Sequence, residues 1–251
     1  MRQLKSDEIQ FDNLTISWTG PSLDEGKMPA LFYFALTGTE SLTLDPFNQI
    51  VQFLHGEKLR VFSLTLPGHG EGLSPTKAIA FWAEEIRGGT KLVDDFVDEA
   101  KRAIDHLFDQ NLISKVATAG LSRGGFIASH LAASDPRIES LLAFSPMIDL
   151  AYMSEFDALK NDPYVQKMHL SQLVDYLAGR DVRFYVGNRD VRVGTRNCFD
   201  FIEALTEKSY EKNRNLIPSE LILRPSIGRD GHGTSPETFK DGAEWIKKKL
   251  L

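Results

Sequence analysis

Cysteine is almost absent from the sequence of 251 residues, in which Cys198 is the only one. A lone cysteine cannot form a disulfide within the chain, and it cannot build a metal site from several thiolates. Long apolar runs are also missing, because no stretch approaches the roughly 18 apolar residues of a membrane-spanning helix. Residues 1–10 lack the apolar core of a secretory signal. These absences favour a protein of the reducing cytoplasm that does not bind membranes.

The sequence has no excess of basic residues either. Its 29 Lys and Arg are outnumbered by 35 Asp and Glu, and the net charge of −6 is spread along the chain. Proteins that bind the phosphate backbone of nucleic acids need clustered positive charge, so we do not expect nucleic acid as a partner. Repeats, low-complexity tracts and Pro/Ser-rich linkers are absent. We therefore predict a single domain over residues 1–251.

What the sequence does contain is a regular alternation of apolar runs and helical patterns. Near-continuous apolar runs predict buried strands at residues 30–36, 60–66, 116–119, 140–144, 182–186 and 220–223. Apolar residues at three- and four-residue steps predict helices over residues 90–110, 198–205 and 236–251. Residues 9–18 alternate loosely and indicate an antiparallel edge strand. The alternation predicts an α/β fold, with a mostly parallel sheet covered by helices on both faces.

Two segments interrupt this alternation. Residues 70–89 follow a strand without a clear helix and contain Phe81 and Trp82. Residues 146–179 are longer than one crossover requires, and they hold three of the five Met together with several aromatic residues. Because such side chains fill irregular apolar space, this insertion is either a small helical lid over an apolar pocket or a pair of packed surface helices.

The most informative motif is Gly120-Leu121-Ser122-Arg123-Gly124, between a predicted strand and a helix of small and apolar residues. In this context G-x-S-x-G is typical of a nucleophile elbow, a tight turn that displays the serine at the edge of the sheet. The flanking glycines allow close backbone approach, and the start of a helix favours negative charge. We therefore predict that Ser122 is a nucleophile; an ordinary Gly-rich turn is the alternative.

A serine nucleophile needs a base, and the base needs an acid that orients it. Four of the six histidines lie in helical stretches or in the insertion and are set aside (His55, His106, His130 and His169). His232 follows the last predicted strand and completes the order serine, acid, histidine that accompanies this elbow. We predict His232 as the base, and we interpret His69, which precedes the serine, as a loop residue near the site.

The acid should follow a strand between Ser122 and His232. Asp190 does so, after an apolar strand and a glycine turn. Asp181 precedes that strand and therefore belongs at the opposite edge of the sheet. Asp230 is only two residues from His232, which makes a side-chain bond awkward. Asp190 is therefore the predicted acid, although an Asp that merely closes its loop is the alternative.

With these motifs the chain resembles the α/β-hydrolase family, from about residue 30 to residue 251, and in particular its branch of serine esterases and acyl-peptidases. The resemblance implies an oxyanion hole made by the N–H of Arg123 and an N–H from the loop after the first parallel strand. Many members carry His-Gly in that loop, where this chain has Thr37-Gly38. Matching Gly38 to the family glycine makes Thr39 the second donor, and Thr37 or Gly38 could serve in its place.

These residues together predict a serine hydrolase that cleaves a small carboxylic ester through an acyl-enzyme. Thioesterase, acyltransferase and small-peptidase activities use the same triad and stay open, as does a binding protein on the same fold. No cofactor or metal is implied, because the sequence has neither a G-x-x-x-x-G-K-[ST] loop nor H-E-x-x-H. The natural substrate and the oligomeric state are left open.

Four arginines lie in or within three residues of the catalytic motifs: Arg123, Arg189, Arg192 and Arg229. This clustering is unexpected in a chain of net charge −6. The arginines either pair with neighbouring aspartates or form a positive rim that attracts an anionic substrate, since the guanidinium fork suits a carboxylate or phosphate.

Overall fold

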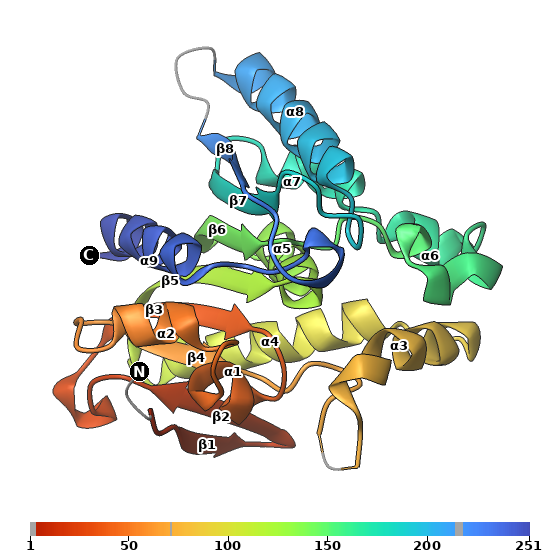
Figure 1. Ribbon diagram of the computed structural model, residues 1–251. Helices are drawn as coiled ribbons and strands as arrows, with labels where there is room; N and C mark the ends of the chain where they lie inside the picture. The colour runs from red at the N-terminus through yellow and green to blue at the C-terminus, as the bar shows by residue number, and fades with distance from the viewer. Residues whose placement is uncertain (1–3, 71, 214–217) are drawn as a thin grey trace.

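The computed structural model describes residues 4–70, 72–213 and 218–251. Eight strands form one sheet in the order β1-β2-β4-β3-β5-β6-β7-β8, which Figure 1 shows from β1 at the bottom to β8 at the top. The strands are β1 (Asp7–Phe11), β2 (Leu14–Thr19), β3 (Met28–Phe34), β4 (Arg60–Ser63), β5 (Ile113–Leu121), β6 (Ile138–Phe144), β7 (Asp181–Gly187) and β8 (Ser219–Arg224). β2 pairs antiparallel with β1 and β4, and the other neighbours pair parallel. The predicted mostly parallel sheet is confirmed.

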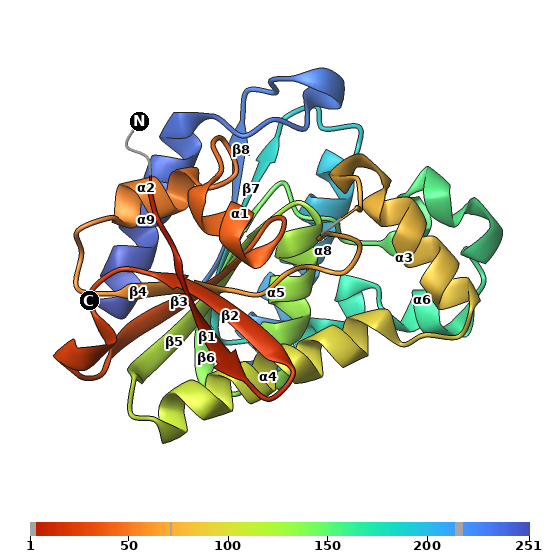
Figure 2. The ribbon, with the colours of Figure 1, turned by 90° about the horizontal axis from the view of Figure 1, so that it is seen from below.

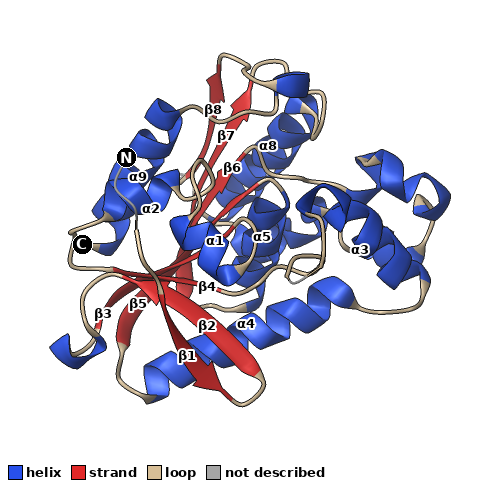
Figure 3. Ribbon diagram, turned by 60° about the horizontal axis from the view of Figure 1, so that its bottom comes forward, coloured by secondary structure: helices blue, strands red, loops and turns tan. Residues whose placement is uncertain are grey.

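Helices cover both faces of the sheet, as Figures 2 and 3 show. One face carries α1 (Gly38–Thr43), α2 (Gln49–Leu54) and α9 (Pro236–Leu250), and the other carries α4 (Leu92–Asp109), α5 (Arg123–Ser134) and α8 (Thr195–Lys212). Strand β3 shows why the predicted strands have continuous apolar runs, since both of its faces are buried. Its Leu31 and Tyr33 are buried against the first group of helices, whereas Phe32 and Phe34 are buried against the second.

The N-terminal segment differs from the prediction, because residues 9–18 belong to two strands rather than one. β1 and β2 form a hairpin in which Phe11 faces Leu14 across the turn. Asp12 in that turn adopts a φ of 50°. Asp tolerates this left-handed conformation better than most residues, so the turn interrupts what reads as one loosely alternating strand.

The prediction of no clear helix in residues 70–89 was wrong. Helix α3 (Ala78–Arg87) follows a single 3-10 turn, Pro75–Lys77. It buries Trp82 completely, and the indole N–H of Trp82 donates to the carbonyl of Pro67 at 2.7 Å. This bond fixes α3 beside the loop that follows β4.

Residues 146–179 fold into short helical pieces, which lie beside α3 in Figures 1 and 2. They are the 3-10 turns Leu150–Tyr152, Ser154–Leu159 and Leu170–Leu173, with α6 (Pro163–Lys167) and α7 (Val174–Leu177). Phe156 and Met168 are buried in the same core cluster as residues of α4, α5 and α8. The hydroxyl of Tyr164 accepts the N–H groups of Val93 and Asp94 at the start of α4. The insertion is therefore anchored to the body of the protein.

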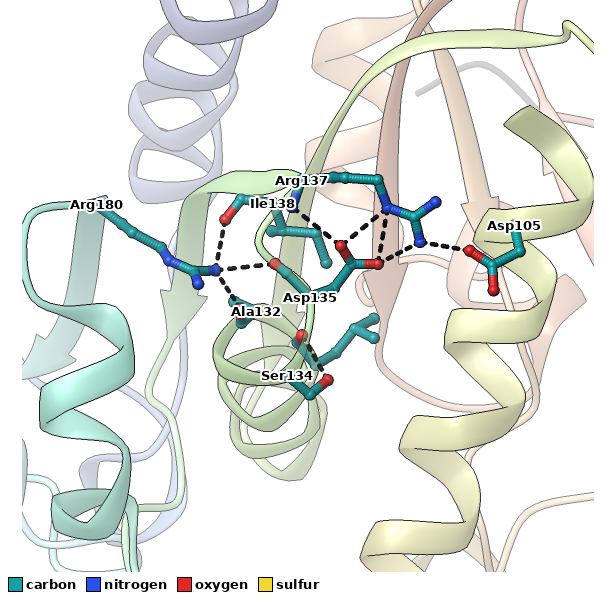
Figure 4. Close-up of polar contacts among 8 residues, drawn as sticks. Asp105, Ala132, Ser134, Asp135, Arg137, Ile138 and Arg180 are labelled. Atoms are coloured by element: carbon teal, nitrogen blue, oxygen red, sulfur yellow. Dashed lines mark hydrogen bonds and ion pairs between the residues drawn. The ribbon is translucent and has the colours of Figure 1, made fainter. Parts of the chain in front are cut away.

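A buried carboxylate ties α4, α5 and β6 together at the end of the sheet away from Ser122 (Figure 4). The side chain of Asp135 is 2% exposed, and both its oxygens accept hydrogen bonds from the Nε of Arg137, at 2.9 and 3.1 Å. Arg137 also contacts Asp105 of α4 at 2.6 Å. Arg180 donates to the carbonyls of Ala132, Asp135 and Ile138.

We expect Asp135→Asn to lower the free energy of unfolding at pH 7 by about 1–2 kcal/mol, because a charged hydrogen-bond pair is lost while Arg137 stays partly hydrated. Burial alone would raise the pKa of Asp135, but the hydrogen bonds and charge of Arg137 outweigh it and hold this pKa below its ordinary value. A carboxylate with a depressed pKa stabilises the folded state above about pH 4, and that contribution disappears as the pH falls through the folded pKa.

Urea unfolding of the wild type and the variant at pH 7 and at pH 3 measures this effect. The difference in stability should shrink at pH 3. The exposed Asp105→Asn is the matched control, with a smaller loss. An equal difference at both pH values would show that Asp135 acts through its shape and not its charge.

Candidate active site

Ser122 lies in the tight turn between β5 and α5, with φ 55° and ψ −117°. Such strained backbone is typical of functional sites, where the surrounding structure holds it. A Cβ on Gly124 would lie 1.9 Å from the carbonyl oxygen of Phe34, so this position requires glycine. The N–H of Ser122 donates to the carbonyl of Phe144 at 2.8 Å, which fixes the turn to the end of β6.

Three side chains from distant parts of the chain form a continuous hydrogen-bonded chain. Nε2 of His232 lies 2.9 Å from Oγ of Ser122, and Nδ1 of His232 lies 2.8 Å from Oδ2 of Asp190. With the proton on Nδ1, the imidazole donates to the carboxylate and accepts the serine hydroxyl. The structure thus brings the predicted nucleophile, base and acid together in the geometry of a Ser-His-Asp triad.

Asp190 is held in one orientation by its own loop after β7. Its side chain is fully buried, and Oδ1 accepts the backbone N–H groups of Arg192 at 3.0 Å and Val193 at 3.1 Å. The other oxygen, Oδ2, is left for His232. The two rejected aspartates lie elsewhere: Asp181 begins β7 and pairs with Lys249, and the side chain of Asp230 is 51% exposed.

His69 is committed to other partners. Its Nδ1 lies 3.2 Å from the carbonyl of Pro67 and its Nε2 lies 2.9 Å from Nη2 of Arg123. Because the guanidinium can only donate, Nε2 accepts and Nδ1 carries the proton. Burial and the charge of Arg123 lower the pKa of His69. His69 is therefore a neutral residue that positions Arg123, which agrees with its interpretation as a loop residue near the site.

The structure does not place Thr39, the predicted second oxyanion donor, among the residues that line the cavity at Ser122. Helix α1 already begins at Gly38, so Thr39 lies in its first turn, and its hydroxyl is 3.3 Å from that of Ser17 on β2. β4 and β3 separate β2 from the strand that carries Ser122. In the loop after β3, Leu36 rather than Thr39 lines the cavity at Ser122. Of the predicted pair, Arg123 is in place as the first residue of α5.

Ser122 and His232 line a cavity of about 430 Å³ that crosses the carboxyl edge of the sheet. On the side of α2 and α9 its walls are apolar and include Leu36, Phe47, Leu121 and Phe239. On the side of α3 and α5 they include Ile79, Met147, Met153, Val193, Arg123 and Arg192. The insertion thus contributes two Met to the cavity. Phe81 and Trp82 pack into the core instead of lining it.

Two of the four arginines line this cavity, namely Arg123 and Arg192. Arg192 forms an ion pair with Glu155 of the insertion at 2.8 Å. Burial and then the positive charge of Arg192 lower the pKa of Arg123 to about 10, so Arg123 stays protonated at neutral pH. The side chain of Arg229 is 96% exposed, and its Nε lies 3.7 Å from Oδ2 of Asp230. Arg229 therefore pairs with a neighbouring aspartate, which was one of the two predicted alternatives.

Within residues 4–70, 72–213 and 218–251, no three His, Cys, Asp or Glu side chains are grouped so that they could hold a metal ion. In these same ranges no helix combines the length and the apolar composition needed to span a bilayer.

Comparisons with known proteins agree with this fold. The family model described as serine aminopeptidase, S33, matches residues 43–192, which include Ser122 and Asp190. The acylamino-acid-releasing enzyme of Arabidopsis thaliana is 21% identical over 282 residues, and the match covers 99% of this chain but 36% of that enzyme. The chain thus spans little more than a third of this curated relative.

Solved structures share the fold over the whole chain at low identity. A Thermus thermophilus protein, TT1662, has a TM-score of 0.72 at 20% identity, with 100% of this chain and 99% of that chain covered. A cold-adapted esterase from an Arctic intertidal metagenomic library has a TM-score of 0.66 at 20% identity, with 100% and 97% covered. Est1E of Butyrivibrio proteoclasticus with ferulic acid bound has a TM-score of 0.64 at 15% identity, with 97% of this chain and 98% of that chain covered. Since the family model matches more than half of the chain, this protein belongs to the S33 serine aminopeptidase family of α/β-hydrolases.

Proposed function

We propose that this protein is a serine carboxylesterase that cleaves a small ester through a covalent acyl-enzyme. The hydrogen-bonded chain from Ser122 through His232 to Asp190, at the wall of a cavity of about 430 Å³, carries the proposal. Membership of a hydrolase family supports it, and so do two esterases whose solved structures share this fold, one from an Arctic metagenomic library and one from Pyrococcus furiosus.

In the proposed mechanism, Oγ of Ser122 attacks the ester carbonyl carbon while Nε2 of His232 takes the hydroxyl proton. The tetrahedral intermediate then collapses, its bond to the alcohol oxygen breaks, and His232 returns the proton to that oxygen. Water repeats the sequence on the acyl-enzyme and releases the acid. Asp190 keeps the proton of the neutral imidazole on Nδ1 and stabilises the imidazolium that forms in each step.

The negative charge that develops on the carbonyl oxygen needs backbone donors. In the proposal, the first donor is the N–H of Arg123 at the start of α5. The second comes from the end of β3, where Leu36 lines the cavity. The N–H of Leu36 donates to Oγ of Ser41 at 2.9 Å in the resting structure, so the oxyanion would share this donor.

A second candidate is amide hydrolysis, because the family model is described as an aminopeptidase and the Arabidopsis relative as an acylamino-acid-releasing enzyme. Parallel assays with p-nitrophenyl esters, acyl thioesters and N-acyl-amino-acid p-nitroanilides separate the candidates, and an added alcohol acceptor reveals acyl transfer. We expect the ester to have the highest kcat/KM. An anilide or thioester turned over faster than the ester would contradict the esterase assignment, and no turnover of any substrate would favour a binding protein.

The apolar walls of the cavity predict a preference for longer acyl chains. Each buried methylene stabilises the transition state by about 0.8 kcal/mol, so kcat/KM should rise up to about 15-fold from acetyl to butyryl p-nitrophenyl esters. Met153→Ala should flatten this series, because Met153 lines the cavity. The control is Leu223→Ala on β8, where the side chain is already exposed. A flat wild-type series would show that the acyl chain does not enter the cavity.

A further inference from the structure

The cavity at Ser122 has one wall that carries excess positive charge. Arg123 follows β5 and Arg192 follows β7, so two different strand ends direct guanidinium groups into the same cavity. We call these two residues the arginine pair. Burial first, and then the charge of Arg192, lower the pKa of Arg123, so the charge of Arg192 acts on Arg123 within the cavity.

The arginine pair has one carboxylate partner. Arg192 bonds to Glu155, with Nη2 to Oε1 at 2.8 Å and Nη1 to Oε2 at 3.4 Å. Arg123 makes no ion pair within 4 Å with any described carboxylate. Its acceptors are neutral: Nε2 of His69 at 2.9 Å and the carbonyl of Pro75 at 3.0 Å. One positive charge is therefore left without an anion in the cavity.

Arg123 also differs from the arginines that hold the fold together. Arg180 and Arg60 each direct their donors at three backbone carbonyls, and Figure 4 shows those of Arg180. The Nε of Arg123, like those of Arg183 and Arg224, is buried and has no hydrogen-bond partner in the described part of the chain, but Arg183 and Arg224 pair with the carboxylates of Glu220 and Asp241. A buried donor without a partner costs free energy unless a ligand or water satisfies it. Arg123 thus lines the cavity with a charge that no described carboxylate pairs within 4 Å, which suits it to receive an anion.

We infer that the arginine pair binds a carboxylate on the substrate, so that the preferred substrates are esters carrying a free carboxylate a few bonds from the scissile carbonyl. This inference rests on the proposed esterase function and adds the substrate class. Guanidinium groups bind carboxylates through paired charged hydrogen bonds. The apolar wall with Leu36 and Phe239 then receives the uncharged half of the ester.

The carboxylate can belong to the acyl half or to the alcohol half of the ester, and two substrate pairs distinguish these. Monomethyl glutarate and methyl glutaramate place the carboxylate, or its neutral amide, on the acyl half. The butyryl esters of glycolate and glycolamide place it on the alcohol half. The ratio of kcat/KM for each acid over its amide should be about 10- to 100-fold for the favoured half, as expected for a hydrogen-bonded charge pair. It should fall in 1 M salt, where the Debye length is about 3 Å.

Three variants test whether this ratio depends on the arginine pair. Arg192→Gln should lower the ratio about tenfold. Glu155→Gln should raise it, because the carboxylate that competes for Arg192 is removed. Arg229→Gln is the matched control, since it deletes the same charge from a side chain that is 96% exposed and outside the cavity. Its ratio should equal that of the wild type.

Three results would overturn the inference. The first is an acid-over-amide ratio of kcat/KM near one in the wild type, with normal turnover of the neutral esters. The others are a fall of this ratio in Arg229→Gln as large as in Arg192→Gln, and a fall of the ratio in Glu155→Gln. The first of these leaves the esterase function standing. A second measurement does not need turnover: calorimetric binding of the same substrate pairs to Ser122→Ala. If no ester is cleaved but the acid binds more tightly than its amide, the esterase proposal fails and the anion site stands. If neither pair shows such a preference, the anion site is refuted.

Discussion

Ser122→Ala and His232→Ala are each expected to reduce kcat for the best ester roughly 10⁵- to 10⁶-fold, as for triads that act as one unit. Without Oγ no acyl-enzyme can form, and without Nε2 of His232 the hydroxyl at 2.9 Å keeps its proton. The double variant should be no slower than either single variant. Steady-state assays on folded proteins, checked by circular dichroism, measure the three rates.

His69→Gln provides the control for the base, because His69 is the other histidine on a loop near the site. It should lose less than about tenfold, since its ring faces Arg123 and Pro67 and does not bond to Ser122. A loss as large as that of His232→Ala in a folded protein would contradict the assignment of the base.

Asp190→Asn should lower kcat about 10⁴-fold while the fold stays intact. The amide can still accept the N–H groups of Arg192 and Val193 through its oxygen, which directs its NH₂ group at Nδ1 of His232. This favours the tautomer with the proton on Nε2, so that the imidazole can no longer accept the proton of Ser122.

Asp230→Asn is the matched control for Asp190→Asn. Asp230 is two residues from His232, but its side chain is half-exposed and pairs with Arg229. Activity should stay within about twofold of the wild type, as for most exposed substitutions. A large loss in this variant, with little loss in Asp190→Asn, would transfer the role of the acid to Asp230.

Local patterns were enough to predict the parts of the site that depend on strand ends. The elbow at Ser122, the glycine turn before Asp190 and the loop at His232 each follow an apolar strand, and parallel strands place such loops at one edge. The position of Thr39 relative to the cavity could not be predicted, because α1 is only six residues long, too short for a periodic pattern. Its orientation depends on Ser17, a contact that no local pattern reveals.

Two fold errors had signals in the sequence. Ile79, Trp82 and Ile86 are spaced for one face of a helix, and all three are buried on α3. The dipeptide Asp12-Asn13 is typical of a turn and marks the hairpin between β1 and β2. In both cases a short element lies between segments with clearer apolar patterns, which obscure its own pattern.

The arginines show that a position close to a catalytic motif in sequence does not determine whether the side chain reaches the cavity. All four lie near catalytic motifs, yet two enter the cavity and Arg229 points into solvent. Arg123 starts α5 beside the nucleophile, and Arg192 lies two residues after the acid, so both reach the cavity wall. Pairing between Arg192 and Glu155 joins residues 37 positions apart, which no local pattern could predict.

Labelling with a fluorophosphonate probe tests Ser122 as the nucleophile, because the reaction needs an activated serine and no knowledge of the substrate. Oγ of Ser122 would attack phosphorus, fluoride would leave, and His232 would take the hydroxyl proton. We expect one phosphonyl group per wild-type chain, located on Ser122 by mass spectrometry, and no label on Ser122→Ala. Equal labelling of Ser122→Ala, or an unlabelled wild type that is folded, would contradict this role of Ser122.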